Sequence, residues 1–414
     1  MKSKLSILFA LAVISNLHSS DPSTEIPIPP QPEVARETHP SGADELFDDL
    51  LELEKQRDPE AVDTLLQDPV EAATIAEEAL EESIKEDSRR RPVEGTFIQL
   101  SREWADHGED EWEENLDILQ DAGMDTLIIQ WTASSSIAYF QPAPEAYTET
   151  YPVINNLFKA AEDREVTIIL GLHCDPKYWE YIDTRNDVRD VYFRVRNTQN
   201  LRLQESLLES FDANPNWTGY YLSEEIDDIN WREPADEEIF HQFLLRSGRI
   251  IHERDPNRTL SISSFFRKRT APSTYANNLI DLMSATRVDR LWIQDGIGVE
   301  PLSGPLIEPY FATLAASRSV DQLPPIGMVV ELFEAVSNPD EQFKAQPALA
   351  MRVKNQLKNA SRVGGPITVF SLFDYADPRG TDKEKKIFEV LKSWNLEIQE
   401  SSESSGRSNQ ESKK

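Results

Sequence analysis

The middle of the chain alternates between two hydrophobic patterns. A short run of β-branched and aromatic residues is followed by a longer stretch whose apolar residues recur three and four positions apart, and this unit occurs eight times. The short runs predict strands at Gly95–Ser101, Asp125–Thr132, Thr167–His173, Gly219–Glu225, Thr259–Phe266, Leu291–Gln294, Ile326–Phe333 and Ile367–Phe373. The longer stretches predict helices at about 111–122, 152–164, 200–211, 236–254, 275–285, 306–319, 344–362 and 382–394.

Strict alternation of strand and helix predicts parallel strands that are joined by right-handed crossovers. Eight such units over about 300 residues match the size of a (β/α)8 barrel, the TIM barrel. A doubly wound open sheet is the alternative, and it usually carries a glycine-rich nucleotide-binding turn after its first strand. That position reads Gln99-Leu-Ser-Arg-Glu-Trp104 in this chain, so we predict an α/β fold with a TIM barrel over residues 93–396.

The segments on both sides of the predicted barrel follow other patterns. Lys2 and Lys4 precede the apolar stretch Leu5–Leu17, which is the order of a signal peptide and predicts export to the periplasm or the exterior, with residues 1–20 removed. Residues 21–92 combine early prolines with many carboxylates and some helical spacing of leucines, which predicts an acidic, partly helical segment that is either a solvated linker or a docking module. Residues 397–414 are rich in Ser, Glu and Lys and predict a disordered tail.

Composition and charge argue against several classes of function. The chain has 42 Lys and Arg against 74 Asp and Glu, a net charge of −32 that repels phosphate backbones and anionic lipids. We therefore expect neither nucleic acid nor, after signal cleavage, a membrane as partner. The single cysteine, Cys174, excludes an internal disulfide and a multi-thiolate metal site, and the histidines lack the paired spacing of zinc ligands. We predict no cofactor and no metal.

The alternation of side chains along each strand predicts which residues face the barrel axis. In the fourth strand Leu222 is expected to face the helices, which turns Glu225 toward the axis. In the seventh strand Met328 and Val330 are expected to face the helices, which turns Glu331 toward the axis. The same phase in the other strands predicts an inward ring of polar residues at the C-terminal ends: Gln99, Gln130, His173, Ser263, Gln294 and Ser371. Active sites of TIM barrels lie at this rim, so we predict the site there.

Aromatic residues gather at or just beyond the same strand ends. Flat apolar rings beside amides and carboxylates suit sugar rings, which stack through their C–H faces and take hydrogen bonds through their hydroxyls. This pattern predicts a poly- or oligosaccharide as the ligand. The expected contacts are Gln99, Trp104, Gln130, Trp131, His173, Trp179, Asp228, Trp231, Gln294, Asp295, Phe333 and Tyr375.

Two glutamates at strand ends fit the chemistry of glycosidic bond cleavage. That reaction needs one protonated carboxyl group to assist the leaving oxygen and one ionised carboxylate as nucleophile or base. Glu225 and Glu331 suit these roles, although an arginine pair or simple solvation would also explain a glutamate at either place. The segment Ser223–Asp228 holds four acids in six residues and admits a Ca²⁺ site, and hence a metal-dependent lyase or isomerase, but its spacing is not that of an EF-hand loop.

Several long motifs carry a likeness to a known family: Gly95–Leu100, Asp125–Thr132, Gly219–Trp231, Trp292–Gly298 and Val330–Glu334. Over about residues 93–396 the chain resembles a bacterial, mostly exported domain family of unknown function, which looks like a branch of the TIM-barrel glycoside hydrolases. The wider retaining clan carries glutamates on strands four and seven, and its fourth strand typically ends in Asn-Glu. The resemblance implies that Glu225 is the acid/base and Glu331 the nucleophile. Glu224 stands where the clan has asparagine, so the acid is either Glu225 or Glu224.

The leading hypothesis is therefore an exported glycoside hydrolase that cleaves a poly- or oligosaccharide with retention. The alternative is a non-catalytic carbohydrate-binding or envelope-associated TIM-barrel protein. A catalyst needs two carboxyl groups in unlike environments across the barrel mouth, whereas a binding protein tolerates one of them locked in a buried arginine pair.

Overall fold

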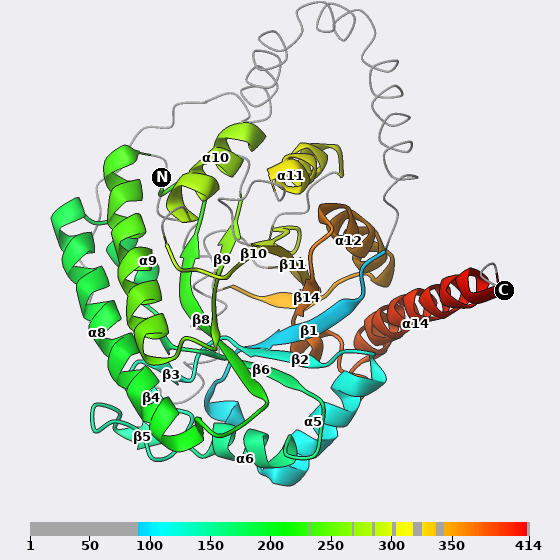
Figure 1. The fold of residues 1–414 in the computed structure, drawn as a ribbon, viewed down its shortest axis with the longest axis horizontal. Helices are drawn as coiled ribbons and strands as arrows, with labels where there is room; N and C mark the ends of the chain where they lie inside the picture. Colours follow the sequence, from blue (N-terminus) through cyan, green and yellow to red (C-terminus); the bar gives the residue numbers. More distant parts are fainter. Residues whose placement is uncertain are drawn as a thin grey trace, which may run out of the picture.

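The computed structural model describes residues 90–231, 233–266, 269–283, 286–299, 304–317, 325–336 and 343–411. The predicted signal peptide and all but the last three residues of the predicted acidic segment lie outside these ranges. Within them, eight parallel strands close into a barrel and helices cover its outside (Figure 1). The predicted TIM barrel is confirmed.

The barrel strands follow one another around the ring in chain order. They are β1 (Val93–Ile98), β2 (Thr126–Ile129), β6 (Thr167–Gly171), β8 (Trp217–Ile226), β9 (Thr259–Phe265), β10 (Arg290–Gln294), β11 (Ile326–Glu331) and β14 (Ile367–Phe370). Parallel pairing of β14 with β1 closes the ring. All C-terminal strand ends therefore meet at one rim.

Helices and short strands connect the barrel strands. The helices are η1 (Arg102–Trp104), α5 (Glu109–Asp121), α6 (Val153–Ala160), α7 (Tyr178–Ile182), α8 (Asn186–Phe211), α9 (Pro234–Arg254), α10 (Pro272–Met283), α11 (Gly304–Ser317), α12 (Ala350–Val363), α13 (Leu372–Tyr375) and α14 (Asp382–Glu411). A small sheet contains β3 (Ala133–Ser134), β4 (Ile137–Ala138), β5 (Glu149–Thr150) and β7 (His173–Cys174), and β12 (Phe333–Ala335) pairs with β13 (Ala345–Pro347). None of the helices in the described part of the chain is long and apolar enough to cross a membrane.

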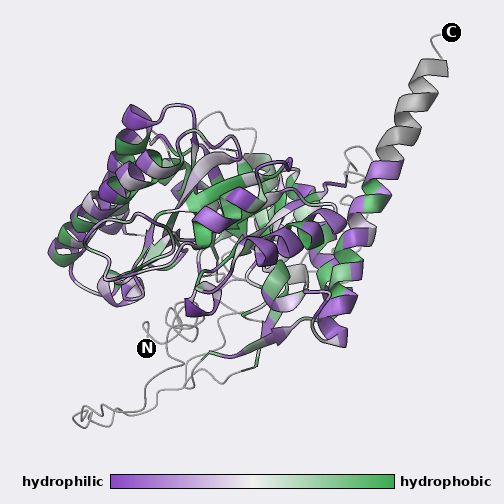
Figure 2. Cartoon of the chain, turned by 90° about the horizontal axis from the view of Figure 1, so that it is seen from below, coloured by the Kyte–Doolittle hydropathy of each residue, from purple (hydrophilic) through white to green (hydrophobic). Residues whose placement is uncertain are grey.

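Side-chain alternation divides the hydrophobic core into an outer and an inner cluster. The outer cluster fills the layer between strands and helices and takes Leu222, Met328 and Val330, as predicted. The inner cluster fills the barrel with Phe97, Ile128, Ile169, Tyr221, Trp292, Val329 and Phe370 and extends to Phe333 and Phe343, which follow β11 in the chain. Figure 2 shows hydrophobic strands in the interior and hydrophilic residues on the outer helices. The interior is thus a packed apolar plug below the polar rim.

The structure differs from the sequence prediction at Ser371. Phe370 takes the inner face of β14, with its ring 6.5 Å from that of Phe97 and 6.0 Å from that of Phe333. Ser371 is instead the N-cap of α13, where its hydroxyl accepts a hydrogen bond from the backbone N–H of Asp374 at 3.3 Å. A phase error of one residue moves a side chain to the other face of a strand, and this error made the prediction for Ser371 wrong.

Two helices are longer than the sequence pattern predicts. The helix expected at 200–211 begins at Asn186. Its first half does not show the helical period of apolar residues, because it buries Arg196 and Asn197 and exposes Val191 and Val195. The last helix, α14, continues to Glu411, into the segment for which the sequence predicts disorder. Leu391 and Trp394 of α14 are buried, and no proline follows in the sequence to end the helix.

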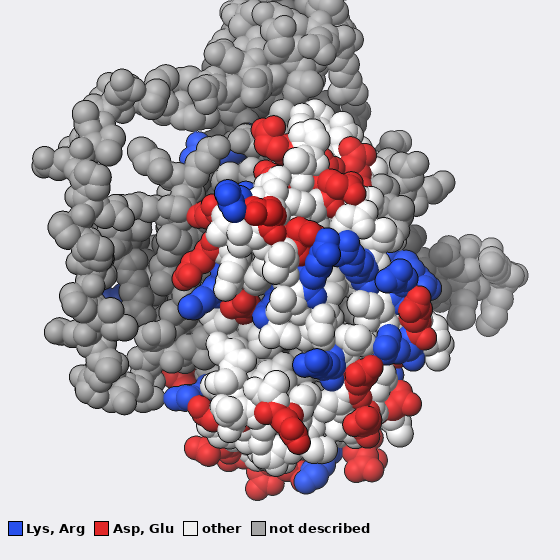
Figure 3. Space-filling view, turned by 90° about the vertical axis from the view of Figure 1, so that its left-hand side faces the viewer, with Lys and Arg blue, Asp and Glu red and all other residues white. Residues whose placement is uncertain are grey.

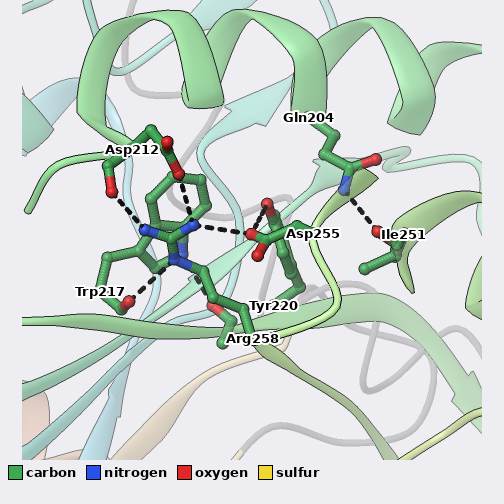
Figure 4. Close-up of polar contacts among 8 residues, drawn as sticks. Gln204, Asp212, Trp217, Tyr220, Ile251, Asp255 and Arg258 are labelled. Carbon is green, nitrogen blue, oxygen red and sulfur yellow. Dashed lines mark hydrogen bonds and ion pairs between the residues drawn. The ribbon is translucent and has the colours of Figure 1, made fainter. Parts of the chain in front are cut away.

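A half-buried arginine joins the N-terminal ends of β8 and β9 to the end of α8 (Figure 4). Arg258 donates through Nε to the carbonyl oxygen of Trp217 at 2.9 Å, through Nη1 to the carboxylates of Asp212 at 3.0 Å and Asp255 at 2.8 Å, and through Nη2 to the carbonyl oxygen of Asp212 at 2.8 Å. Tyr220 also donates to Asp255, at 2.8 Å. Every guanidinium nitrogen of Arg258 thus has a partner, as a structural role requires.

On the side of the molecule that carries α8 and α9, acidic and basic side chains are interspersed (Figure 3). Arg254 of α9 and Glu205 of α8 form one exposed pair, with 3.3 Å between Nε and Oε1 and 37% and 49% of the side chains accessible. Solvent screens such pairs, so they contribute little to stability.

We expect Arg258→Gln to lower the free energy of unfolding by about 3 kcal/mol, because it leaves the Asp255 carboxylate buried without its cation. Arg254→Gln is the matched control, and we expect it to stay within about 0.5 kcal/mol of wild type. Urea unfolding followed by circular dichroism measures both. Equal stability of the two variants would contradict the structural role of Arg258.

Candidate active site

Polar side chains form a hydrogen-bonded network inside the C-terminal rim of the barrel. Gln99 donates to the side-chain oxygen of Gln130 at 2.8 Å, which joins the ends of β1 and β2. Gln294 of β10 donates to the hydroxyl of Ser263 at 3.1 Å and to Oε1 of Glu225 at 2.6 Å. The predicted inward positions of these five residues agree with this network.

Glu225 lies at the end of β8 and is buried. Besides the amide of Gln294, the hydroxyl of Ser263 lies 3.5 Å from the same carboxylate oxygen. Tyr221, four residues earlier on the same strand, shares a hydrogen bond of 2.7 Å with Ser263. Side chains of β9 and β10 therefore orient the Glu225 carboxylate.

Glu331 ends β11 and is fully buried. Its Oε2 accepts a hydrogen bond of 2.6 Å from the backbone N–H of Gly298. A Cβ atom at position 298 would lie 2.7 Å from that oxygen and 2.7 Å from the carbonyl oxygen of Phe333, so the close approach requires glycine. Burial raises the pKa of Glu331, the charge of Asp295 raises it further, and the charge of Glu225 acts in the same direction. Glu225 and Glu331 thus lie within electrostatic reach of each other.

Two residues of α12 donate hydrogen bonds to the backbone and to the carboxylate of Asp295 around Glu331. Gln356 donates to Asp295 at 2.7 Å and to the carbonyl oxygen of Glu331 at 3.1 Å. Arg352 donates to the carbonyl oxygens of Ile297 at 3.1 Å and Glu331 at 3.5 Å, and also to that of Phe333. Neither residue was predicted from the sequence. Their signal is a polar pair four residues apart on a helix whose other inward positions are apolar.

Asp295 lies at the centre of this support and is itself buried. Its Oδ1 accepts from the backbone N–H of Ile297 at 3.3 Å and from that of Glu331 at 3.4 Å. Burial raises the pKa of Asp295, and the hydrogen bond from Gln356 opposes the shift. Asp295 therefore orients the chain around Glu331, and the two carboxyl groups disfavour each other's ionisation.

Glu224 points to the other side of β8. The charge that acts on it most strongly is that of Arg196 on α8, followed by Asp175. Burial raises the pKa of Glu224 to about 7, and Arg196 opposes the shift. The adjacent glutamates thus belong to different environments, Glu225 to the rim network and Glu224 to the layer between β8 and α8.

The remaining acids of Ser223–Asp228 form turns and do not converge. Asp227 accepts the backbone N–H groups of Ile229 at 3.1 Å and Asn230 at 2.6 Å. Asp228 accepts those of Arg269 at 2.8 Å and Thr270 at 3.2 Å. In the described part of the chain, no group of three or more His, Cys, Asp or Glu side chains gathers as metal ligands. The geometry therefore gives no support to the Ca²⁺ interpretation.

His173 lies just beyond the rim, in β7 of the small sheet. Its Nδ1 shares a hydrogen bond of 3.0 Å with the hydroxyl of Tyr147, and its backbone N–H donates to Asn200 at 3.1 Å. Burial lowers the pKa of His173 to about 3, and the charge of Arg196 adds to this shift. His173 is therefore a neutral imidazole beside the rim.

The structure places several of the predicted aromatic contacts away from the axis. Trp131, Trp179 and Trp231 are buried in the outer cluster, so the predicted ligand-facing position of these three is wrong. Trp104 is half-buried and packs against the same cluster. Alternation explains Trp131, because its neighbour Gln130 takes the inner face. Phe333 belongs to the inner cluster, and the ring of Tyr375 lies 5.3 Å from it. These two remain at the mouth of the barrel.

We expect Glu224 to make the protein less stable as pH rises. A carboxyl group whose pKa is raised by folding destabilises the folded state progressively from the unfolded pKa, 4.5, up to the folded pKa, about 7. Between pH 5 and pH 8, wild type is expected to lose about 2.5 kcal/mol more of its unfolding free energy than Glu224→Gln. Urea titrations at several pH values measure this difference, and Glu253→Gln on exposed α9 is the control that keeps the wild-type slope. Parallel curves for wild type and Glu224→Gln would contradict the burial of this charge.

Comparison with solved structures relates the barrel to known folds. The structure of a "putative alpha-L-fucosidase" from Bacteroides thetaiotaomicron VPI-5482 aligns with a TM-score of 0.60 at 14% identity and covers 75% of this chain and 95% of that chain. A beta-galactosidase from the haloarchaeon Halorubrum lacusprofundi aligns with a TM-score of 0.50 at 11% identity, over 74% of this chain and 58% of that chain. At these identities the likeness shows the fold alone, the TIM barrel.

Sequence comparison gives the family. The uncharacterized protein YbcH of Escherichia coli strain K12 is 29% identical over 262 residues, which are 63% of this chain and 83% of YbcH. The model of a domain of unknown function, DUF4434, matches residues 93–382, the whole barrel through β14. The chain therefore belongs to the DUF4434 family.

Proposed function

We propose that this protein is a glycoside hydrolase that cleaves a poly- or oligosaccharide with retention of anomeric configuration. The observation that carries the proposal is the pair Glu225 and Glu331, buried at the ends of β8 and β11 and held by donors of different kinds. The fold shared with glycosidases supports the reaction class by analogy. Because Glu224 belongs to the layer outside the barrel, Glu225 is the acid/base of this proposal.

In the first step, Glu225 gives its proton to the leaving glycosidic oxygen while Glu331 attacks the anomeric carbon. The bond to the leaving group breaks and a glycosyl ester of Glu331 forms. In the second step, Glu225 takes a proton from water, whose oxygen attacks the same carbon and releases Glu331 as a carboxylate. Both glutamates end the cycle as they began.

The hydrogen bonds of Glu331 fit the role of nucleophile. Oε2 is occupied by the N–H of Gly298, whereas Oε1 has no hydrogen-bond partner among the described residues and is the oxygen available for the anomeric carbon. Because burial and Asp295 raise the pKa of Glu331, its ionised fraction grows with pH. The reaction rate is therefore expected to fall as the pH is lowered and Glu331 becomes protonated.

A non-catalytic carbohydrate-binding protein is the second candidate. The full burial of Glu331 favours it, because a nucleophile has to meet its substrate. The placement of Arg352 favours the enzyme, because this arginine donates to backbone carbonyl oxygens rather than locking the carboxylate of Glu331.

We expect Glu331→Gln to reduce turnover by about 10³-fold or more while thermal unfolding stays close to wild type. Glu225→Gln is expected to lose about 10²- to 10⁴-fold on substrates with poor leaving groups, and far less on aryl glycosides whose leaving group needs no proton. Initial rates on aryl glycosides and oligosaccharides of fucose, galactose, xylose and mannose measure both effects.

Glu334→Gln serves as the matched control, because Glu334 lies on β12, where it accepts from Gln346 at 2.6 Å. It is expected to keep the wild-type rate. Wild-type turnover in Glu331→Gln would contradict the role of Glu331. Binding of these sugars by wild type with no turnover of any of them would leave the binding-protein candidate.

We also propose that the protein is exported, which the order of Lys2, Lys4 and the apolar stretch Leu5–Leu17 supports. Expression of the full chain in a bacterial host is expected to yield a periplasmic or secreted product that lacks about the first 20 residues. Mass spectrometry of fractionated cells measures this. A full-length product that stays in the cytoplasm would contradict export, and Leu8→Arg, which places a charge inside the apolar stretch, is the control that blocks it.

A further inference from the structure

Arg196 on α8 and Glu224 on β8 are buried charges whose hydrogen-bonding groups are mostly unused. Arg196 is 5% exposed and Glu224 2%. In the described part of the chain, Nε and Nη1 of Arg196 and both carboxylate oxygens of Glu224 have no hydrogen-bond partner. The remaining nitrogen of Arg196, Nη2, lies 3.8 Å from Asp175. Each charge acts on the other, yet no hydrogen bond joins them.

Buried polar groups in native proteins normally have partners, because an unmade hydrogen bond in the interior costs the desolvation of the group. Arg258 shows such an arrangement, with every guanidinium nitrogen donating to an oxygen (Figure 4). The unpaired nitrogens of Arg196 and oxygens of Glu224 would therefore be satisfied by a hydrogen-bonding partner from outside the described residues.

The same layer contains further unused polar groups. The hydroxyl of Tyr192 and the amide nitrogen of Asn200 also lack partners among the described residues. The guanidinium of Arg196 lies 5.4 Å from the ring centroid of Tyr192. These four residues, Arg196, Glu224, Tyr192 and Asn200, are called the Arg196 cluster below. Together they offer both donors and acceptors to one ligand.

The Arg196 cluster adjoins the candidate active site. Ser223, the residue before Glu224, is only half-buried and donates to the carbonyl oxygen of His173 at 2.9 Å. Tyr147, half-buried as well, binds the imidazole of His173 at 3.0 Å. Ser223 and Tyr147, which contact His173 beside the rim, are thus partly accessible to solvent.

Hydrogen bonds within the protein account for only part of the polar face of α8, because Asn197 accepts from Ser247 at 2.7 Å and Asn200 accepts from the backbone N–H of His173 at 3.1 Å, whereas two nitrogens of Arg196 stay unpaired. This helix turns Arg196, Asn197 and Asn200 inward, yet leaves Val191 60% and Val195 48% exposed. The hydrophobic effect favours the opposite arrangement. A ligand that uses the inward polar groups would explain why they are there.

The chemistry of the unused groups selects the ligand. An anionic group would suit Arg196 but would be repelled by Glu224 and Asp175, and an ammonium group would be repelled by Arg196. A hydroxyl group accepts from a guanidinium and donates to a carboxylate, so adjacent hydroxyls satisfy both sides. We propose that the Arg196 cluster is a subsite for adjacent hydroxyl groups of a neutral sugar residue. This rests on the proposed function and narrows its substrate to neutral glycans rather than uronic, sulfated or amino sugars.

Calorimetric titration with monosaccharides tests the subsite without any turnover. The probes are L-fucose, D-galactose, D-mannose and D-xylose, with D-galacturonic acid and D-galactosamine as charged counterparts. At least one neutral sugar is expected to bind, and Arg196→Gln and Glu224→Gln are each expected to weaken its binding about tenfold or more. The charged counterparts are expected to bind more weakly than the neutral sugars.

Two further variants separate binding from folding. Arg258→Gln is the matched control, because it removes an ion-paired arginine at the N-terminal ends of β8 and β9, far from the rim, and is expected to lower thermal stability without changing the sugar affinity. Tyr192→Phe removes only one hydroxyl, and its expected loss of affinity reports on the cluster even where Arg196→Gln fails to fold.

Several results would overturn the subsite. One is unchanged sugar affinity in Glu224→Gln and Tyr192→Phe, which would mean that buried water binds these groups. The others are tighter binding of a charged counterpart than of the neutral sugars, and no binding of any neutral probe. Unchanged affinity in these variants with turnover lost in Glu331→Gln would remove the subsite and leave the hydrolase. Lost affinity in Glu224→Gln and Tyr192→Phe together with wild-type turnover in Glu331→Gln would keep the subsite and remove the proposed hydrolase mechanism.

Discussion

The closed ring of parallel strands constrains every other feature of this molecule, because closure fixes which side of each strand faces the axis. Alternate residues meet inside a space too narrow for water, and rings such as Phe97, Trp292 and Phe370 fill it. This plug is the floor of the rim. Carboxyl groups immediately above it lose hydration, so burial is the largest influence on the pKa of Glu331 and of Asp295.

A desolvated carboxylate has to be held by the protein itself, and α12 does this from outside the barrel. Gln356 and Arg352 reach between the ends of β10 and β11 and donate mainly to backbone carbonyl oxygens. On the opposite side, α8 presents Arg196 to the layer beside β8. The site therefore depends on the helical layer as much as on the strands, which is why a substitution on α12 or α8 reaches the chemistry.

The barrel and the two central glutamates were predictable from sequence because both follow from short-range periodicity. Leu222 and Met328 face the helices and fix the phase of β8 and β11, and side-chain alternation likewise predicts the inward positions of Gln99, Gln130 and Gln294. Alternation does not apply at Ser371, where the strand ends and a helix cap begins. The inward positions of Arg352 and Arg196 do not follow from alternation either, because they depend on how a helix packs against strands distant in sequence. Trp131, Trp179 and Trp231 follow strand ends in the chain, yet packing turns them to the helices.

The two central glutamates differ in what a single substitution can change around them. Glu225 accepts from the side chains of Gln294 and Ser263, so exchange of either residue alters its surroundings directly. Glu331 accepts from a backbone N–H at a position where only glycine fits, and a main-chain donor persists whatever side chains surround it. Side-chain substitutions, in the family or in the laboratory, can therefore change the hydrogen bonds to Glu225, whereas the main-chain hydrogen bond to Glu331 stays the same.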